Sequence, residues 1–380
     1  MTYSGPIIDC DVHHDWATPE HLHPYLSSGW QEYVAGPGRL YGGGESIPLF
    51  PAQLIPNPTG TNRPEAFPGN GHAAASDYDL MNEQLLDPFR IERVVLQYGA
   101  SGFIGALSNP YFATEIARAA NDWSIDQWLS RDDSRLYGAV LVATQQPDEA
   151  AAEVRRVGGH PGMAEVMLAS SGLGKPFGHP AYHPIYEAAV EMGLPVAIHT
   201  GGEAFANQGV SPMASGMPMF YYEVAMLTFM GSMTHITSLI SHGVFEKFPD
   251  LKVLIVESGL GWVPGLLWRL DAGYRALRRE LPWLKKHPSE YFAEHFRITT
   301  QPLDCPPDKE QLIQLLEMFD GANTLCFSSD YPHWDGDEIS YVSEWLPSSW
   351  HDRVFRENAV ELYGWSELAG ASEAESLSAR

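Results

Sequence analysis

Positive charge is scarce in this sequence of 380 residues. It contains 23 Lys and Arg residues against 48 Asp and Glu residues, so its formal net charge at pH 7 is −25. A surface this acidic repels phosphate backbones and anionic lipids. The composition therefore excludes nucleic acid and membranes as expected partners. It leaves a small-molecule substrate, which senses only the local field of its own pocket.

Cysteines and long apolar runs are also few. The three cysteines, Cys10, Cys305 and Cys326, are an odd number without a CxxC pair, which does not fit a disulfide framework. We see no apolar run long enough to span a bilayer, and no basic region followed by an apolar one at the N-terminus. We therefore expect a cytoplasmic protein, and we expect it to form a homo-oligomer, namely a dimer.

A glycine-rich phosphate loop is missing as well, since no GxGxxG follows any apolar run. Eight short apolar runs are present instead, and segments with helical periodicity separate most of them. Runs that are apolar on successive positions are typical of parallel strands buried on both faces. This alternation predicts an α/β fold, a (β/α)₈ TIM barrel forming one domain over residues 1–367, with a doubly wound sheet as the alternative. The eight runs are PIIDCDV (6–12), 91–99, 136–144, 163–170, 194–200, 251–259, 296–301 and 324–330.

Two segments depart from this pattern. Residues 27–76 are rich in Gly, Pro, Asn and Ser and follow the first strand, so in a barrel they emerge on the face that carries active sites. We interpret them as a lid or a wall of the substrate pocket, with a solvated insertion or a subunit contact as the alternatives. Residues 368–380 are small and polar, and we expect a disordered tail.

Ionisable residues stand where the apolar runs end. Asp11 and His13 end the first run, and side chains two positions apart share one face of a strand. His199, Glu257 and Asp330 end the fifth, sixth and eighth runs. Burying unpaired charges costs several kcal/mol, so a metal ion is the first candidate to compensate them. Two imidazoles and two carboxylates from three strands form a plausible four-ligand site with room for water.

The chain resembles one known family over nearly its whole length, and five segments carry the resemblance. The chain is similar to amidohydrolase-related proteins of the aminocarboxymuconate-semialdehyde decarboxylase type, a branch of the metal-dependent amidohydrolase superfamily. The resemblance implies a metal held by Asp11, His13, His199 and Asp330. The segments are IIDCDVHH, HPAYHPIYEAAVEMGLPVAIHTGG (179–202), GVFEKFPDLKVLIVESGLGWVPGLLWRLD (243–271), FSSDYPHWDGD (327–337) and ENAVELYG (357–364).

Two departures from the family pattern matter for the chemistry. Family members often have His-x-His on the first strand, and this chain has Asp-x-His, which makes the site harder. One Zn²⁺ ion is our first expectation, and Mn²⁺ is its rival. The family decarboxylases also carry a histidine on the sixth strand, where this chain has Glu257.

The leading functional prediction is a metal-dependent hydrolase. Water bound to the metal would attack a carbonyl next to a C–N bond or an activated C–C bond. The resemblance implies that Asp330 both touches the metal and moves the proton. His333 is a candidate to polarise the substrate or protonate a leaving group, and Glu257 to position water. The alternatives are a non-oxidative decarboxylase of an aromatic or enol acid, with Glu257 as the acid, and a non-catalytic binding protein on the same barrel.

Four further residues are weaker candidates. His235 and His242 lie in a segment with helical spacing, where a histidine is more often a packing or surface group. We place His235 among the catalytic residues and His242 among the pocket residues. Trp262 and Trp334 are candidates to stack on an aromatic substrate, although buried tryptophan is ordinary in a core.

Overall fold

Eight parallel strands form the centre of the computed structural model, which describes residues 2–35, 59–69, 71–200 and 220–365. Each strand pairs with the next along the chain, in the order β1 to β8. The sheet closes where the backbone N–H of Cys10 donates to Phe327 and that of His13 donates to Tyr331, at 3.0 and 2.7 Å. The predicted (β/α)₈ barrel is thereby confirmed. The strands are β1 Ile7–His14, β2 Ile91–Tyr98, β3 Leu136–Leu141, β4 Met163–Leu168, β5 Val196–His199, β6 Val253–Val256, β7 Phe296–Thr299 and β8 Leu325–Cys326.

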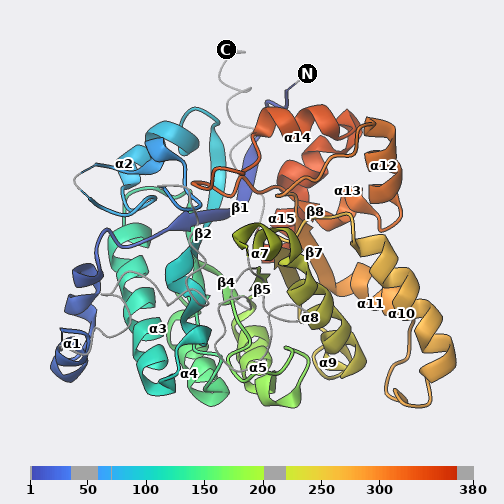
Figure 1. Ribbon diagram of the computed structural model, residues 1–380, viewed down its shortest axis with the longest axis horizontal. Helices are drawn as coiled ribbons and strands as arrows, with labels where there is room; N and C mark the ends of the chain where they lie inside the picture. Colours follow the sequence, from blue (N-terminus) through green and yellow to red (C-terminus); the bar gives the residue numbers. More distant parts are fainter. Residues whose placement is uncertain (1, 36–58, 70, 201–219, 366–380) are drawn as a thin grey trace, which may run out of the picture.

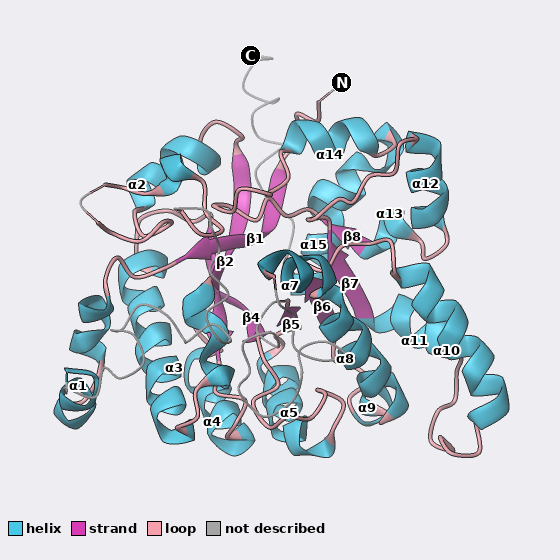
Figure 2. Ribbon diagram, in the orientation of Figure 1, coloured by secondary structure: helices cyan, strands magenta, loops and turns pink. Residues whose placement is uncertain are grey.

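Helices surround the strands on all sides of the view in Figure 1, and Figure 2 shows the strands enclosed at the centre. Proline opens several of these helices, because its fixed φ suits the first helical turn and its missing N–H is not needed there. The main helices of the barrel are α3 Pro110–Ser124, α4 Pro147–Val157, α5 His183–Met192, α7 Tyr221–Leu227, α8 Phe229–Ser241, α9 Val244–Lys247, α10 Val263–Leu277, α11 Pro288–His295 and α12 Lys309–Glu317. The remainder are α1 Ser28–Ala35, α2 Tyr78–Met81, α13 Gly321–Thr324, α14 Ile339–Trp345 and α15 Asn358–Tyr363.

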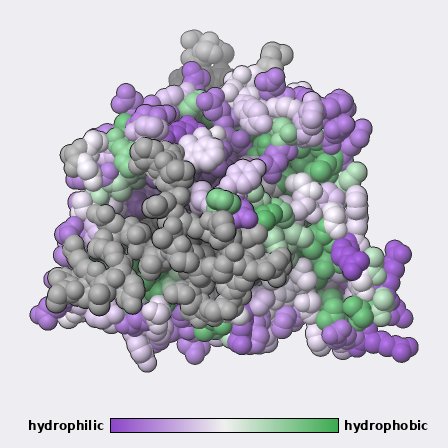
Figure 3. Space-filling view, viewed as in Figure 1, coloured by the Kyte–Doolittle hydropathy of each residue, from purple (hydrophilic) through white to green (hydrophobic). Residues whose placement is uncertain are grey.

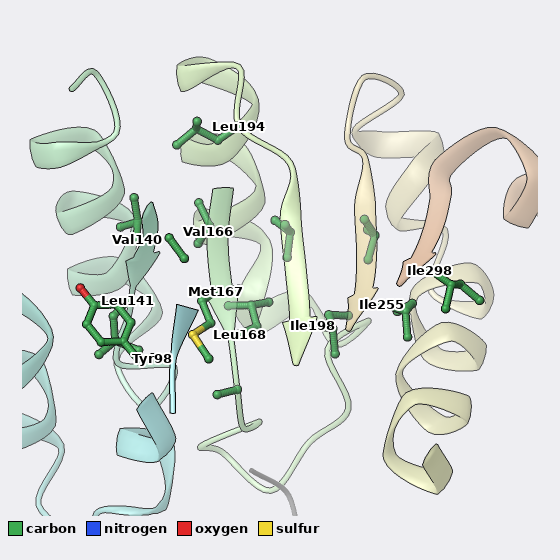
Figure 4. Packing of buried hydrophobic residues seen from close by; sticks show 14 of the residues in the cluster. Tyr98, Val140, Leu141, Val166, Met167, Leu168, Leu194, Ile198, Ile255 and Ile298 are labelled. Carbon is green, nitrogen blue, oxygen red and sulfur yellow. The ribbon is translucent and has the colours of Figure 1, made fainter. Parts of the chain in front are cut away.

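Apolar side chains fill two separate spaces. The larger cluster lies between the strands and the helices around them, where Val140, Ile198 and Ile255 are packed as Figure 4 shows. Burying one such side chain contributes about 1.5–3 kcal/mol. A smaller cluster fills the barrel interior near the strand starts, and α15 covers it. Its members are Ile8, Cys10, Val95, Ala164, Ala197, Leu254, Val256, Cys326, Ala359, Leu362 and Tyr363.

The predicted insertion 27–76 contains more regular structure than its composition suggests. Its first part forms α1, which corrects the expectation of an irregular stretch throughout. Residues 36–58 and 70, and the tail from 366, lie outside the described residues. In the later part, Asn62 pairs with His333 in an antiparallel bridge, and the side chain of Arg63 donates to the His333 carbonyl at 2.9 Å. The described end of the insertion therefore contacts the loop after β8, while the lid role stays a prediction.

One helical segment needs a correction to the expectation about membranes. Residues Tyr221–Ser241 have the length and composition of a span, with a mean hydropathy of 1.3. Core helices of soluble proteins pass the same test, and this segment packs on the barrel through Ser232, whose hydroxyl lies 2.7 Å from that of Ser258.

Hydrophilic residues dominate the upper rim in Figure 3, and hydrophobic ones gather on the right. The cytoplasmic location and the dimer stay predictions.

Candidate metal centre

The first strand carries a bulge at its polar residues. Asp9 pairs with Val94 and Val12 pairs with Leu96, so three steps along β1 match two along β2. Bulges re-aim side chains and are common next to active sites. Asp11 lies within this bulge and is 0% exposed, and neither oxygen of its carboxylate has a hydrogen-bond partner in the described part of the chain.

A bound cation would compensate the buried negative charge of Asp11. Burial, and after it the negative charge of Asp330, raises the pKa of the Asp11 carboxyl well above its usual range. A buried carboxylate without a partner costs several kcal/mol. A divalent ion removes this cost, because it supplies the opposite charge and takes up the free oxygens.

Two histidines face the same carboxylate oxygen. The Nε2 atoms of His13 and His199 each lie 3.9 Å from Oδ1 of Asp11. Ligand atoms bound to one ion at 2.0–2.2 Å lie roughly 3–4 Å from each other. These three atoms already have spacings of this kind, since they all lie within 4.8 Å of one another.

The chemical state of His199 suits a metal ligand. Its Nδ1–H donates to the carbonyl of Thr200 at 2.8 Å, which leaves Nε2 as the acceptor that faces the site. Burial, with a further effect from His13, lowers the pKa of His199 to about 3. The imidazole is therefore neutral at physiological pH, which is the form that binds metals.

Asp330 connects the two sides of the site. Its Oδ1 lies 3.0 Å from Nε2 of His13 and 2.8 Å from Nδ1 of His333. Burial alone would raise the pKa of Asp330, but the charge and hydrogen bonds of these two histidines outweigh it and lower the pKa well below its usual range. Burial would lower the pKa of His333, and the Asp330 carboxylate raises it to about 9 instead. The two shifts are opposite in direction, and each favours the charged form of its group.

Glu257 stands directly after β6, beside the same cluster. Its Oε2 lies 3.6 Å from Nε2 of His199. Burial and the nearby Asp330 charge raise the pKa of the Glu257 carboxyl well above its usual range. Both Glu257 and Asp330 have left-handed backbones, with φ of 52° and 56°, which strains a residue that is not glycine. Such strain at two strand ends is typical of a functional site.

The donor set fits a hard divalent cation. Two possible groups of ligands share His13: one is Asp11, His13 and His199, and the other is His13, Glu257, Asp330 and His333. The hydrogen bond of His199 to Thr200 orients one of the imidazoles. Asp11, His13, His199 and Asp330 would hold the ion, and Glu257 and His333 stand beside it.

A match to a family model identifies the family of this chain. The model, described as Amidohydrolase, matches residues 8–365. The chain belongs to the amidohydrolase family. The resemblance found in the sequence is thereby confirmed, and the protein is a metal-dependent enzyme of the amidohydrolase superfamily.

Relatives of this amidohydrolase include two curated decarboxylases. It is 25% identical to the gamma-resorcylate decarboxylase of Polaromonas sp. over 70% of this chain and 79% of that protein. It is 27% identical to the 2-amino-3-carboxymuconate-6-semialdehyde decarboxylase of Dictyostelium discoideum, over 68% and 69% of the two chains. Its fold is similar to 5-carboxyvanillate decarboxylase of Novosphingobium aromaticivorans, solved with manganese and 4-hydroxy-3-methoxy-5-nitrobenzoic acid. That structure has a TM-score of 0.65 and 22% identity, covering 94% of this chain and 96% of the other.

The structure places the weaker candidates of this amidohydrolase elsewhere. His235 is buried against Phe177, with ring centroids 4.2 Å apart, and its Nδ1 accepts the backbone N–H of Phe177 at 3.1 Å. His242 follows α8 and lies beside His179, with ring centroids 6.1 Å apart. Ten residues of helix separate His242 from Ser232, about 15 Å along the axis. This placement argues against a pocket contact for His242, and the catalytic role of His235 stays a prediction.

The two tryptophans differ from each other. The indole N–H of Trp262 donates to the carbonyl of Ser258 at 2.7 Å, next to Glu257. Trp334 has 54% of its surface exposed, and its backbone N–H donates to Thr61 in the insertion at 2.9 Å. Trp262 is therefore the tryptophan that the structure brings toward the end of β6, and the pocket role of both stays a prediction.

Sequence reasoning missed two residues that shape the site. The hydroxyl of Thr299, on β7, accepts the backbone N–H of Glu257 at 3.0 Å and so supports the strained turn. Gln97 lies on β2 in register with His13. Both are uncharged and stand in or beside apolar runs, so no charge pattern in the sequence marks them.

Proposed function

We infer that this enzyme is a metal-dependent, non-oxidative decarboxylase of a small hydroxy-substituted aromatic or enol acid. The observation that carries this proposal is the position of Glu257, whose carboxyl group stands 3.6 Å from a metal-ligating histidine. A decarboxylase needs a proton donor at the carbon that loses carbon dioxide. The raised pKa of Glu257 supports this role, because a protonated carboxyl can donate.

This proposal reverses the order of the functions expected from the sequence. The sequence has a glutamate after β6 where the family decarboxylases have a histidine, and this difference favoured hydrolysis in the sequence analysis. The two curated relatives are both decarboxylases. We propose that Glu257, whose carboxyl group lies 3.6 Å from His199, supplies the proton in place of the histidine that this chain lacks. Decarboxylation is therefore the better-supported function, and hydrolysis becomes the outcome that the experiment must exclude.

Each residue of the site has a distinct role in the proposed decarboxylation. Asp11, His13, His199 and Asp330 would hold the divalent ion, whose positive charge would attract the carboxylate of the substrate. As the bond from the ring carbon to the carboxyl carbon breaks, its electron pair stays on the ring carbon. Glu257 donates its proton to that carbon and is later reprotonated from solvent. His333, held protonated by Asp330, adds positive charge near the negative charge that develops.

For the metal we propose Mn²⁺ ahead of Zn²⁺. Two of the four ligands are carboxylates, which are harder donors than imidazole or thiolate. The 5-carboxyvanillate decarboxylase of similar fold was solved with manganese. Metal analysis of protein purified without chelators or added metal would test this, with close to one equivalent expected.

Turnover in labelled water tests the reaction itself. The Mn²⁺-loaded enzyme is incubated with a panel of hydroxybenzoates, including 2,6-dihydroxybenzoate, in ¹⁸O water and separately in D₂O. We expect carbon dioxide, one deuterium on the carbon that carried the carboxylate, and no ¹⁸O in the aromatic product. Label in the organic product without carbon dioxide, from any ester, amide or diketone in a parallel panel, would show a hydrolase instead.

Glu257→Gln is the matched variant, because it keeps the size of the side chain and removes the acid. We expect kcat to fall by roughly 10²–10⁴-fold with the metal content unchanged. In the wild type the rate should fall as pH rises through the raised pKa of Glu257, since only the protonated form donates. A variant with unchanged kcat would remove Glu257 from the mechanism.

A further inference from the structure

Strand β2 carries a polar side chain into the upper barrel interior. Val95 belongs to the interior cluster, and strand alternation places Gln97, two residues later, on the same face. Gln97 pairs in register with His13. Neighbouring strands lie about 4.8 Å apart, so Gln97 stands beside a metal ligand on the barrel wall.

The amide of Gln97 is buried without hydrogen bonds. The residue is 0% exposed, and neither Oε1 nor Nε2 has a partner among residues 2–35, 59–69, 71–200 and 220–365. Its backbone carbonyl is satisfied from the other face of the strand, where Nδ1–H of His14 donates to it at 2.9 Å. Each buried polar group left without a partner costs about 1–3 kcal/mol, so native proteins keep such groups where a ligand or water completes them.

Asn121 shows what a structural amide looks like in the same fold. It is also 0% exposed, but its Nδ2 donates to the Leu141 carbonyl at 2.9 Å and to Oε1 of Glu153 at 2.7 Å. Its Oδ1 accepts the backbone N–H of Leu141 at 2.8 Å. Asn121 therefore ties α3 to β3, while the equally buried Gln97 ties no element to another through its side chain.

We propose that Gln97 is a specificity-determining residue that hydrogen-bonds an ortho hydroxyl group of the substrate, beside the carboxylate held at the metal centre. The assignment of this hydroxyl rests on the proposed decarboxylase function. A neutral amide offers one acceptor and two donors. A hydroxyl next to a carboxylate offers a donor for Oε1 and an acceptor for Nε2, side by side. The position next to His13 places this contact on the β2 side of the metal, opposite Glu257 on β6.

The first test needs no substrate. Gln97→Met keeps the length of the side chain and removes the unsatisfied amide, so the melting temperature of the Mn²⁺-loaded protein should stay the same or rise. Asn121→Leu is the matched control, and it should lower the melting temperature by several degrees because it removes the hydrogen bonds of the amide to the Leu141 backbone and to Glu153. A fall for Gln97→Met as large as that for Asn121→Leu would mean that the amide has a structural role, and would overturn the proposal.

The second test measures the hydroxyl contact directly. In the wild type, 2,6-dihydroxybenzoate should bind at least about tenfold more tightly than 2-hydroxybenzoate, because the latter leaves the amide unpaired. In Gln97→Met this ratio should fall to about one, with the affinity for 2-hydroxybenzoate little changed. An unchanged ratio would overturn the hydroxyl contact.

Failure of the proposed function would look different. If the wild type binds neither acid while Gln97→Met keeps its melting temperature, the decarboxylase proposal and the hydroxyl assignment are both overturned. The role of Gln97 as a contact for some other ligand is then supported by the stability result alone.

Discussion

The carboxyl groups at the two ends of the barrel interior have different surroundings. At the end that α15 covers, Glu165 is fully buried among apolar side chains, and its Oε2 accepts the hydroxyl hydrogen of Tyr363 at 3.0 Å. At the other end, Glu257 stands among Asp11, His13, His199, Asp330 and His333. Burial raises the pKa of both glutamates, but among the described residues Glu257, unlike Glu165, belongs to a group that could hold a metal ion.

The difference shows that a buried carboxyl group is not by itself a sign of function. The raised pKa of Glu165 favours its neutral form, and one of its two oxygens, Oε2, accepts a hydrogen bond from Tyr363, while Oε1 has no partner among the described residues. Glu257 is held on a strained backbone beside groups that bind a cation. Glu257 has several ionisable neighbours and directly follows the end of β6, whereas Glu165 has one hydroxyl partner. These differences distinguish the two roles.

Removing a ligand at the functional end should produce the largest effect. Asp11→Ala deletes a carboxylate with two free oxygens, and we expect the bound metal to fall from one equivalent to near zero. Loss of outer partners of a metal site alone costs 10–100-fold, so activity should fall by more than about 100-fold. Metal analysis and turnover of the purified variant check this.

Glu165→Gln is the control at the opposite end, since it keeps the hydrogen bond to Tyr363 and lies outside the metal cluster. It should retain the metal and the wild-type rate. Equal metal loss in both variants would mean that the two ends of the barrel are not separate in function.

A pH-dependent stability difference should be the next largest effect. The pKa of Glu165 is raised by burial from 4.5 to about 8 in the folded protein. The folded state therefore holds this proton more tightly than the unfolded state, and its stabilising effect is complete below pH 4.5 and lost as pH rises through 8. Between pH 5 and pH 9, wild type should lose on the order of a few kcal/mol relative to Glu165→Gln.

Urea unfolding of both proteins at several pH values measures this difference, and the subtraction removes the contributions of the other titrating groups. A difference that does not change with pH would show that Glu165 has the same pKa in both states.

The smallest effect is expected away from both ends. His242→Ala should leave kcat and KM within about twofold, because His242 lies about 15 Å along α8 from the residue that touches the end of β6. A clear rise in KM would restore the pocket contact predicted from the sequence, and would place the lower part of α8 in the substrate site.

The fold was predictable because the strands contain short apolar stretches, most of which are separated by segments with helical periodicity. Each of the eight runs coincides with a strand, although β1 continues to His14, beyond the first run. Strand β8 is only Leu325–Cys326 where the sequence suggested 324–330, and the residues after it keep single hydrogen bonds to β1. The sequence did not reveal that α15 closes the barrel floor. Its short apolar pattern is the same for a surface helix and for one that packs inside.

The site was predictable only where charge marks it. Alternation along β1 placed Asp11 and His13 together, and the strand ends indicated His199, Glu257 and Asp330. The bulge in β1 depends on pairing with β2, so no local pattern shows it. His235 lies on α8 and His242 directly follows it, and helical spacing does not tell how far along the axis a pocket extends. Gln97 carries no charge, and its unpaired amide exists only in the packed structure.

The left-handed backbones of Glu257 and Asp330 have a consequence for engineering. Glycine adopts this conformation without strain, whereas other residues are held in it at a cost of about 1–3 kcal/mol. A library selected only for resistance to heat would therefore enrich glycine at both positions and select against the catalytic site. A selection for thermostable variants of this enzyme therefore has to measure turnover in the same round. Otherwise it will recover variants that are more stable but inactive.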